Sequence, residues 1–174
     1  MSILIVVILL VAGLAVFVAS RPGRFRIKRS TLIRAPAAAL FAQVEDFRQW
    51  PNWSPWARRD PSMQVAYEGA ERGVGAVQRW VGSKETGKGS ATIVESQADE
   101  RLLVRLEFIE PFRATSLAEF RFTPEAGGTR VSWSMSGSNG FIGKAISLFC
   151  DVDGRVGGDF EQGLEQLRRQ VEAA

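Results

Sequence analysis

Trp50-Pro51-Asn52-Trp53-Ser54-Pro55-Trp56 places three of the chain's five tryptophans within seven residues. Each proline lacks a backbone N–H and has a fixed φ angle, so this stretch predicts a stiff irregular loop instead of a regular helix or a central strand. Large aromatic side chains on such a loop either fill a hydrophobic core or line the entrance to a hydrophobic cavity. The sequence leaves both interpretations of this tryptophan loop open.

Downstream of the tryptophan loop, apolar and polar residues alternate with the period of two that is typical of β-strands. Such alternation predicts an antiparallel sheet with one face in water and the other face covered. Gly127-Gly128 interrupts the pattern and predicts a hairpin turn. Together with a first strand before the loop, the strands are expected at residues 25–28, 31–33, 64–67, 75–81, 89–95, 102–109, 115–123 and 129–136.

A short helix is expected after Ala35-Pro36, and a long helix is expected near the C-terminus. Gly154, Gly157 and Gly158 predict a break or kink at the start of the long helix. A curved antiparallel sheet wrapped around a long C-terminal helix is an α+β arrangement, the helix-grip fold. The apolar residues at helical spacing are Leu40, Phe41 and Val44 in the short helix and Phe160, Leu164, Leu167 and Val171 in the long one.

Residues 3–19 form an apolar run without a charge. Seventeen helical residues reach about 25 Å, the lower limit for crossing the hydrocarbon core of a bilayer. The sequence therefore predicts one N-terminal transmembrane helix, an anchor over residues 1–20, ahead of the helix-grip fold. A cleaved signal peptide and a buried core helix are the alternatives, although no positively charged segment precedes the run, as a signal peptide would require.

A basic juxtamembrane segment over residues 21–30 follows the apolar run and continues into the first strand. By the positive-inside rule, this segment predicts a single-pass protein of the cytoplasmic membrane whose C-terminal domain, residues 25–174, lies in the cytoplasm. The cations are concentrated beside the predicted membrane exit and are not spread over a folded face, which argues against nucleic acid as a partner. The five basic residues are Arg21, Arg24, Arg26, Lys28 and Arg29.

The chain has no histidine and a single cysteine, Cys150. The commonest metal ligand and the usual general base are therefore missing, and neither an internal disulfide nor a cysteine-rich zinc site can form. We expect no metal, no cofactor and no catalytic constellation. Cys150 is interpreted as a small buried hydrophobic residue.

Several short motifs resemble those of the START-like helix-grip superfamily (SRPBCC), in its polyketide cyclase/dehydrase branch. The resemblance covers about residues 25–172, and it implies a hydrophobic cavity between sheet and C-terminal helix that binds an apolar small molecule. It brings no shared catalytic residue. The motifs are Ile33-Arg34-Ala35-Pro36, Asp46 with Trp50-Pro51 and Trp53-Ser54-Pro55-Trp56, Asp60-Pro61, Gly73-Val74-Gly75-Ala76 before Trp80, Gly127-Gly128-Thr129, and Asp159-Phe160-Glu161-Gln162-Gly163-Leu164.

Residues on the covered face of the sheet and on the helix are the candidates for lining this cavity. Gln78 shares a face with Trp80 and is a candidate hydrogen-bonding group. Asp153 falls on the apolar stripe of the helix, where a carboxylate would be a polar anchor or a proton donor. Alternatively Val152 turns inward and Asp153 caps the following turn. The candidates are Trp53, Trp56, Gln78, Trp80, Val104, Leu106, Phe108, Phe120, Trp133, Phe149 and Asp153.

Three functions fit these patterns. The first is a membrane-tethered domain that binds or transfers a hydrophobic, lipid-like molecule. The second is a polyketide cyclase/dehydrase-like enzyme on an apolar substrate, with Asp153 or Tyr67 as acid or base. The third is an interaction module whose cavity is filled by its own side chains. The volume and lining of the gap between sheet and C-terminal helix would discriminate between them.

Overall fold

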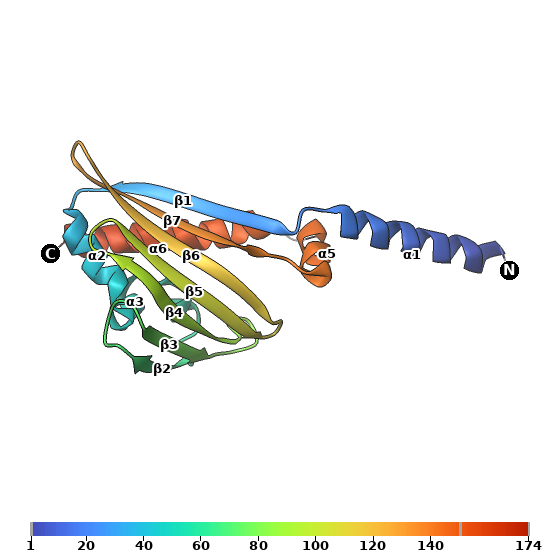
Figure 1. The fold of residues 1–174 in the computed structure, drawn as a ribbon, viewed down its shortest axis with the longest axis horizontal. Coiled ribbons are helices and arrows are strands. Elements are labelled where there is room, and N and C mark those ends of the chain that lie inside the picture. Colours follow the sequence, from blue (N-terminus) through green and yellow to red (C-terminus); the bar gives the residue numbers. More distant parts are fainter. Residues whose placement is uncertain (1, 150, 174) are drawn as a thin grey trace.

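The structure, a computed structural model, describes residues 2–149 and 151–173. A seven-stranded antiparallel sheet, with strand order β1-β7-β6-β5-β4-β3-β2, curves along the C-terminal helix α6 (Figure 1). The predicted α+β helix-grip fold is confirmed. The strands are β1 (Arg24–Ile33), β2 (Gln64–Gly69), β3 (Ala76–Val81), β4 (Lys88–Gln97), β5 (Arg101–Glu110), β6 (Ala114–Glu125) and β7 (Gly128–Ser138).

Four short helical elements lie between the first two strands. The predicted short helix is present as α2. The helical elements are α1 (Ser2–Ser20), α2 (Ala37–Glu45), the 3-10 helix η1 (Phe47–Gln49), α3 (Trp50–Trp53), α4 (Pro55–Arg59), α5 (Phe141–Phe149) and α6 (Val152–Glu172).

The alternating pattern gives the sheet one buried inner face and one exposed outer face. In β5, Leu102 and Val104 are completely buried whereas Arg105 is exposed. The inner face carries Ile33, Phe120 and Trp133 into a core shared with α2, α3 and α6. The two predicted pieces 25–28 and 31–33 form the single strand β1, and the other strands differ from their predicted bounds by at most two residues at either end.

The tryptophan stretch is helical, so the prediction of an irregular loop is wrong. It forms the single-turn helices α3 and α4, each with a proline in its first turn. Proline is tolerated there because the first N–H groups of a helix have no partner within the helix, and its fixed φ angle suits a helix. The two prolines therefore start these helices and limit how far the preceding one extends.

The C-terminal helix also differs from its prediction. Helix α5 ends at Phe149 and α6 begins at Val152. Helix α6 then runs through Gly154, Gly157 and Gly158 without interruption. The Asp151 side chain starts α6 by accepting a hydrogen bond from the Gly154 N–H at 2.8 Å. Of these three glycines, Gly157 allows close packing against Arg29, whereas nothing lies within 4 Å of a Cβ at Gly158. The predicted break at the glycines is therefore wrong by a few residues.

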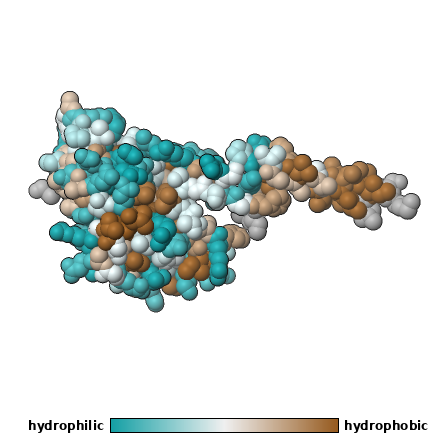
Figure 2. Space-filling view, viewed as in Figure 1, coloured by the Kyte–Doolittle hydropathy of each residue, from teal (hydrophilic) through white to brown (hydrophobic). Residues whose placement is uncertain are grey.

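Helix α1 extends away from the body, with apolar side chains exposed around it (Figure 2). Its C-terminal end lies beside α5, where the Lys144 ammonium donates to the Ala19 carbonyl at 3.0 Å. Among residues 2–149 and 151–173, no helix is long and apolar enough to cross a membrane, so the predicted transmembrane helix is not supported.

Candidate functional site

One end of the space between the sheet and α6 is filled by stacked aromatic rings. Trp133 of β7 lies between Phe120 of β6 and Phe160 of α6, with ring centroids 4.8 Å and 4.2 Å away. All three side chains are buried. Stacked and edge-to-face rings at these distances stabilise the folded chain by more than their buried apolar area alone accounts for. This stack is part of the protein core and leaves no room for a ligand between these three rings.

The tryptophan stretch closes the same end. Trp53 is completely buried, and its indole N–H donates to the Gln43 carbonyl at 3.1 Å. Trp50 is also buried and donates to the Val44 carbonyl at 2.9 Å. Trp56 is half-buried, with its ring edge-to-face to Trp133 at 5.5 Å. The structure thus places Trp50 and Trp53 in the core, and Trp56 at the boundary between core and solvent.

The other end of the inner face is less covered. Strand register aligns the β1 residue Phe25 with Gly137, Ser116, Leu106, Ala91 and Gln78 on successive strands. A second row aligns Trp80, Gly89, Phe108 and Ala114. The large side chains in these rows are half-buried, whereas those nearer the aromatic stack are fully buried. We call this surface the inner-face floor: Phe25, Gln78, Trp80, Leu106, Phe108 and Met135.

Two glycines allow aromatic rings to lie flat on the floor. A Cβ at Gly89 would lie 2.5 Å from the Trp80 ring, and a Cβ at Gly137 would lie 2.9 Å from the Phe25 ring. The Trp80 ring also meets Phe108 edge-to-face at 5.9 Å, and its N–H donates to the Thr86 carbonyl at 3.3 Å. A glycine inside a strand often marks such a close approach. Gly89 is the first residue of one predicted strand and Gly137 lies just beyond another, so the alternation did not reveal these close approaches.

A buried carboxylate fixes the turn that supports Trp80. Asp60 accepts hydrogen bonds from the Ser62 hydroxyl at 2.6 Å, the Thr86 hydroxyl at 2.5 Å and the Ser83 N–H at 2.7 Å. These donors hold the pKa of Asp60 well below its usual range, because each stabilises the ionised form. Asp60 thereby links the end of α4 to the β3–β4 turn. Sequence reasoning noted Asp60 only as part of a motif.

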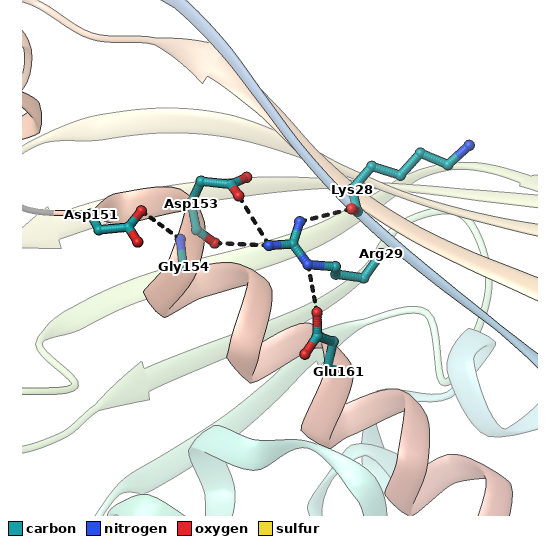
Figure 3. A network of polar contacts seen from close by, with 6 residues as sticks. All are labelled: Lys28, Arg29, Asp151, Asp153, Gly154 and Glu161. Carbon is teal, nitrogen blue, oxygen red and sulfur yellow. Dashed lines mark hydrogen bonds and ion pairs between the residues drawn. The ribbon is translucent and has the colours of Figure 1, made fainter.

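Asp153 does not line the interior, so its prediction as a cavity residue is wrong. Its side chain is 62% exposed and pairs with Arg29 at 3.0 Å (Figure 3). Val152 turns toward the core instead. The capping role falls to Asp151. The reason is that the apolar stripe continues from Val156 back by four residues to Val152, and not by three to Asp153.

Arg29 of β1 is the residue of the sheet that pairs with Asp153. It lies opposite Trp133 in the β1–β7 register, on the inner face, and pairs with Glu161 at 2.8 Å as well as with Asp153. Hydrogen bonds from its guanidinium to Asp153 and then Glu161 raise the pKa of Arg29. The Arg29 side chain, which belongs to the predicted basic segment over residues 21–30, connects β1 to the first turns of α6 (Figure 3).

The remaining candidates do not form a catalytic pair. Tyr67 is exposed on β2 at one edge of the sheet, beneath the Arg48 guanidinium at 5.3 Å. Partial burial raises the pKa of Tyr67. Asp153 lies beside β1 at the opposite edge. The Phe149 side chain and Cys150 lie outside the described part of the structure. In that described part, no group of three or more histidine, cysteine or acidic residues could hold a metal ion.

Two hollows lie beside the floor, at the end of the sheet from which α1 leaves. A hollow of about 480 Å³ is bounded by the β5–β6 hairpin and includes Phe108 and Ala114. A second, of about 340 Å³, lies between the β3–β4 turn and the β5 end, with Val81 and Pro111 in its wall. Both are open at the surface and are lined by apolar and charged side chains.

The model of a family described as polyketide cyclase / dehydrase and lipid transport matches residues 24–172. The fold is similar to that of an uncharacterised protein from Rhizobium leguminosarum, with a TM-score of 0.63 and 17% identity over 88% of this chain and 98% of that one. It is also similar to BexL, a di-domain ARO/CYC protein of the BE-7585A biosynthetic pathway, with a TM-score of 0.64 and 18% identity over 90% of this chain and 53% of that one.

A further similar structure is StfQ, the di-domain ARO/CYC protein of the steffimycin biosynthetic pathway. Its TM-score is 0.66 and its identity is 9%, over 87% of this chain and 51% of that one. Identities this low establish a shared fold and nothing more. A search of curated proteins finds no match.

Proposed function

Because the chain belongs to the polyketide cyclase/dehydrase and lipid transport family, we propose that it binds a hydrophobic, lipid-like small molecule on the inner-face floor. The observation that carries the proposal is the half-buried aromatic and aliphatic surface of Trp80, Leu106 and Phe108. Apolar area that stays partly in water contributes about 25 cal/mol per Å² when a ligand covers it. Gln78 on the same face supplies a polar group that can orient such a ligand.

Binding is favoured over catalysis because the two candidate acid–base residues lie at opposite edges of the sheet. General acid–base chemistry needs its groups within hydrogen-bond reach of one substrate. Tyr67 on β2 and Asp153 beside β1 are separated by the width of the sheet. The interaction-module alternative is supported by the aromatic stack around Trp133, which fills the other end of the inner face.

A membrane location is the second part of the proposal. The exposed apolar side chains of α1 support attachment of the chain to a lipid bilayer, with the body on the cytoplasmic side. Attachment would keep the floor close to a supply of lipid-like ligands. Cell fractionation tests this part: the full chain is expected in the membrane fraction, and a shortened chain beginning at Arg21 in the supernatant. Recovery of both chains in the supernatant would contradict it.

Ligand binding is tested with NBD-labelled stearate and the shortened chain beginning at Arg21, which keeps every family-matched residue. Fluorescence of the probe is expected to rise on binding and to saturate. Leu106→Gln, on the floor, is expected to weaken binding by about tenfold, since it places a polar group against the apolar chain. The matched control is Leu117→Gln on the exposed outer face of β6. Equal affinities for the two variants would move the site away from the floor, and an absence of saturable binding would favour the interaction module.

A further inference from the structure

The sheet register brings four separate segments to one end of the body. Arg24 at the start of β1 pairs with Ser138 at the end of β7, and Phe108 pairs with Ala114 across the β5–β6 hairpin. Val81 pairs with Lys88 across the β3–β4 turn. Helices α1 and α5 meet at the same end (Figure 1). We call this surface the α1 end, comprising residues 20–24, 81–88, 109–114 and 139–144.

Large apolar side chains are exposed at the α1 end. Phe112 at the tip of the β5–β6 hairpin is 57% exposed and Phe141 at the start of α5 is 53% exposed. Ile109 and Val81 are exposed on the segments beside them. Four exposed apolar side chains therefore lie on three segments at this end of the body.

Charge is also distributed unequally along the sheet. The α1 end carries six cations against two acids: Arg21, Arg24, Lys84, Lys88, Arg113 and Lys144 against Glu85 and Glu110. At the opposite end, residues 33–36, 70–75, 98–100, 124–127 and 170–173 carry two cations against five acids: Arg34 and Arg72 against Glu71, Asp99, Glu100, Glu125 and Glu172. The body therefore has a positive end at α1 and a negative end opposite it.

We propose that the α1 end of the body docks on the surface of an anionic lipid bilayer. Phe112 and Phe141 would lie at headgroup depth, where aromatic rings are favoured, and Lys84 and Arg113 would contact lipid phosphates. The hydrogen bond from Lys144 to the Ala19 carbonyl holds α5 beside the end of α1, so the docking surface continues from α1. This proposal rests on the membrane location proposed above and adds the surface and lipid chemistry that hold the body there.

Docking would place the ligand site next to the bilayer, which is the source of lipid-like ligands. Both hollows and the Trp80–Phe108 row lie at the α1 end. A lipid-like molecule leaving the bilayer at this surface would reach the floor without crossing the polar outer face of the sheet. The opposite end, closed by Trp50 and Trp53, offers no comparable route.

The experiment uses the full chain in lipid nanodiscs, made of phosphatidylcholine alone or of phosphatidylcholine with phosphatidylglycerol. Amide hydrogen exchange is measured in both. We expect exchange in residues 109–114 and 82–87 to slow by about tenfold or more in the anionic nanodiscs, since docking excludes water from these amides. Exchange in the opposite-end turns, residues 98–100 and 124–127, is expected to be equal in the two lipids.

Matched variants separate docking from general effects of charge and hydrophobicity. Phe112→Ser, and the double variant Lys84→Glu with Arg113→Glu, are expected to abolish the lipid-dependent protection. Val74→Ser is the control for Phe112, since Val74 is 59% exposed at the opposite end. The double variant Arg34→Glu with Arg72→Glu is the control for charge. Both controls are expected to keep the protection.

The docking proposal would be overturned if residues 109–114 and 82–87 exchanged equally fast in the two lipids. It would also be overturned if their protection survived both α1-end variants. Protection of equal size in neutral nanodiscs would also overturn its electrostatic part. A chain that fails to associate with either nanodisc overturns docking and the membrane location together. Stearate binding by the shortened chain, measured separately, shows whether the ligand-binding part still stands in each of these cases.

Discussion

The guanidinium of Arg29 on β1 occupies the space that a side chain at position 157 of α6 would need. A Cβ at Gly157 would overlap with the end of Arg29, while Arg29 pairs with Asp153 and Glu161 on either side along the helix. An arginine on the inner face of a sheet is therefore accommodated by a glycine on the helix that faces it. The two acids hold the guanidinium beside α6 (Figure 3), and the absence of a side chain at Gly157 leaves room for it.

Alanine at two adjacent glycines tests this relationship. Gly158→Ala is expected to raise the free energy of unfolding by about 0.5–1 kcal/mol, because alanine favours a helix and nothing lies within 4 Å of its Cβ. Gly157→Ala has the same helical benefit but displaces Arg29, so its gain is expected to be smaller or negative. Urea denaturation measures both. Equal gains would mean that the Arg29 guanidinium is not held against Gly157.

A closer approach occurs at Gly163, where α6 meets the aromatic stack. A Cβ there would lie 2.8 Å from the Trp133 ring and 3.2 Å from Pro55. Neither a stacked ring nor a proline moves easily, so Gly163→Ala is expected to lower the free energy of unfolding by about 1–3 kcal/mol. Gln162→Ala at the exposed neighbouring position is the control, with an expected change within about 0.5 kcal/mol. Similar urea midpoints for the two variants would contradict the packing argument.

The hydrogen bonds that Asp60 accepts are expected to make the free energy of unfolding depend on pH. The pKa of Asp60 is lowered in the folded chain, so folding favours its ionised form. The stabilisation is complete above the pH of about 4 at which an unfolded aspartate titrates, and it is lost as the pH falls toward the lower folded value. Asp60→Asn is therefore expected to reduce stability at neutral pH and to flatten its decline in acid. The control is Asp99→Asn in an exposed turn. Parallel stability–pH curves for wild type and Asp60→Asn would refute the prediction.

The sheet could be predicted closely because each strand alternates between a dry face and a wet one. The helical regions could not, because their bounds depend on caps and close contacts that involve distant residues. Pro51 and Pro55 predict a loop until one knows that each lies in the first turn of a helix. Asp153 could be placed inside or outside because steps of three and of four residues back from Val156 both fit a helix, and only the contacts of Val152 with the core decide between them.

The candidate site was predictable in part for the same reason. Trp80, Leu106 and Phe108 follow from alternation, and the structure places them on one half-buried surface. Phe25 and Arg29 were missed as inner-face residues because the dense charge around them is typical of a membrane exit. Val104, Phe120 and Trp133 share the predicted face but lie in the filled part of it. Which part of an inner face is filled depends on where α6 crosses the sheet, and a single sequence does not encode that simply.

Two buried tryptophans give a final prediction, because only one of them has a hydrogen bond. The Trp53 indole N–H donates to the Gln43 carbonyl, whereas the buried Trp133 N–H has no partner within the described residues. Replacement by phenylalanine removes a similar volume at both sites, but at Trp53 it also removes the hydrogen bond to the partly buried Gln43 carbonyl. Trp53→Phe is therefore expected to cost about 1 kcal/mol more than Trp133→Phe in urea denaturation.

The measurement is made on chain stripped of lipid by organic solvent and on chain purified without that step. An equal or larger cost for Trp133→Phe in both samples would mean that its N–H is satisfied by an ordered water in the core. A larger cost only in the unstripped sample would mean that a co-purified molecule accepts this hydrogen bond. That second outcome would extend the ligand site from the inner-face floor into the aromatic stack, and it would require the stack to open when the ligand enters.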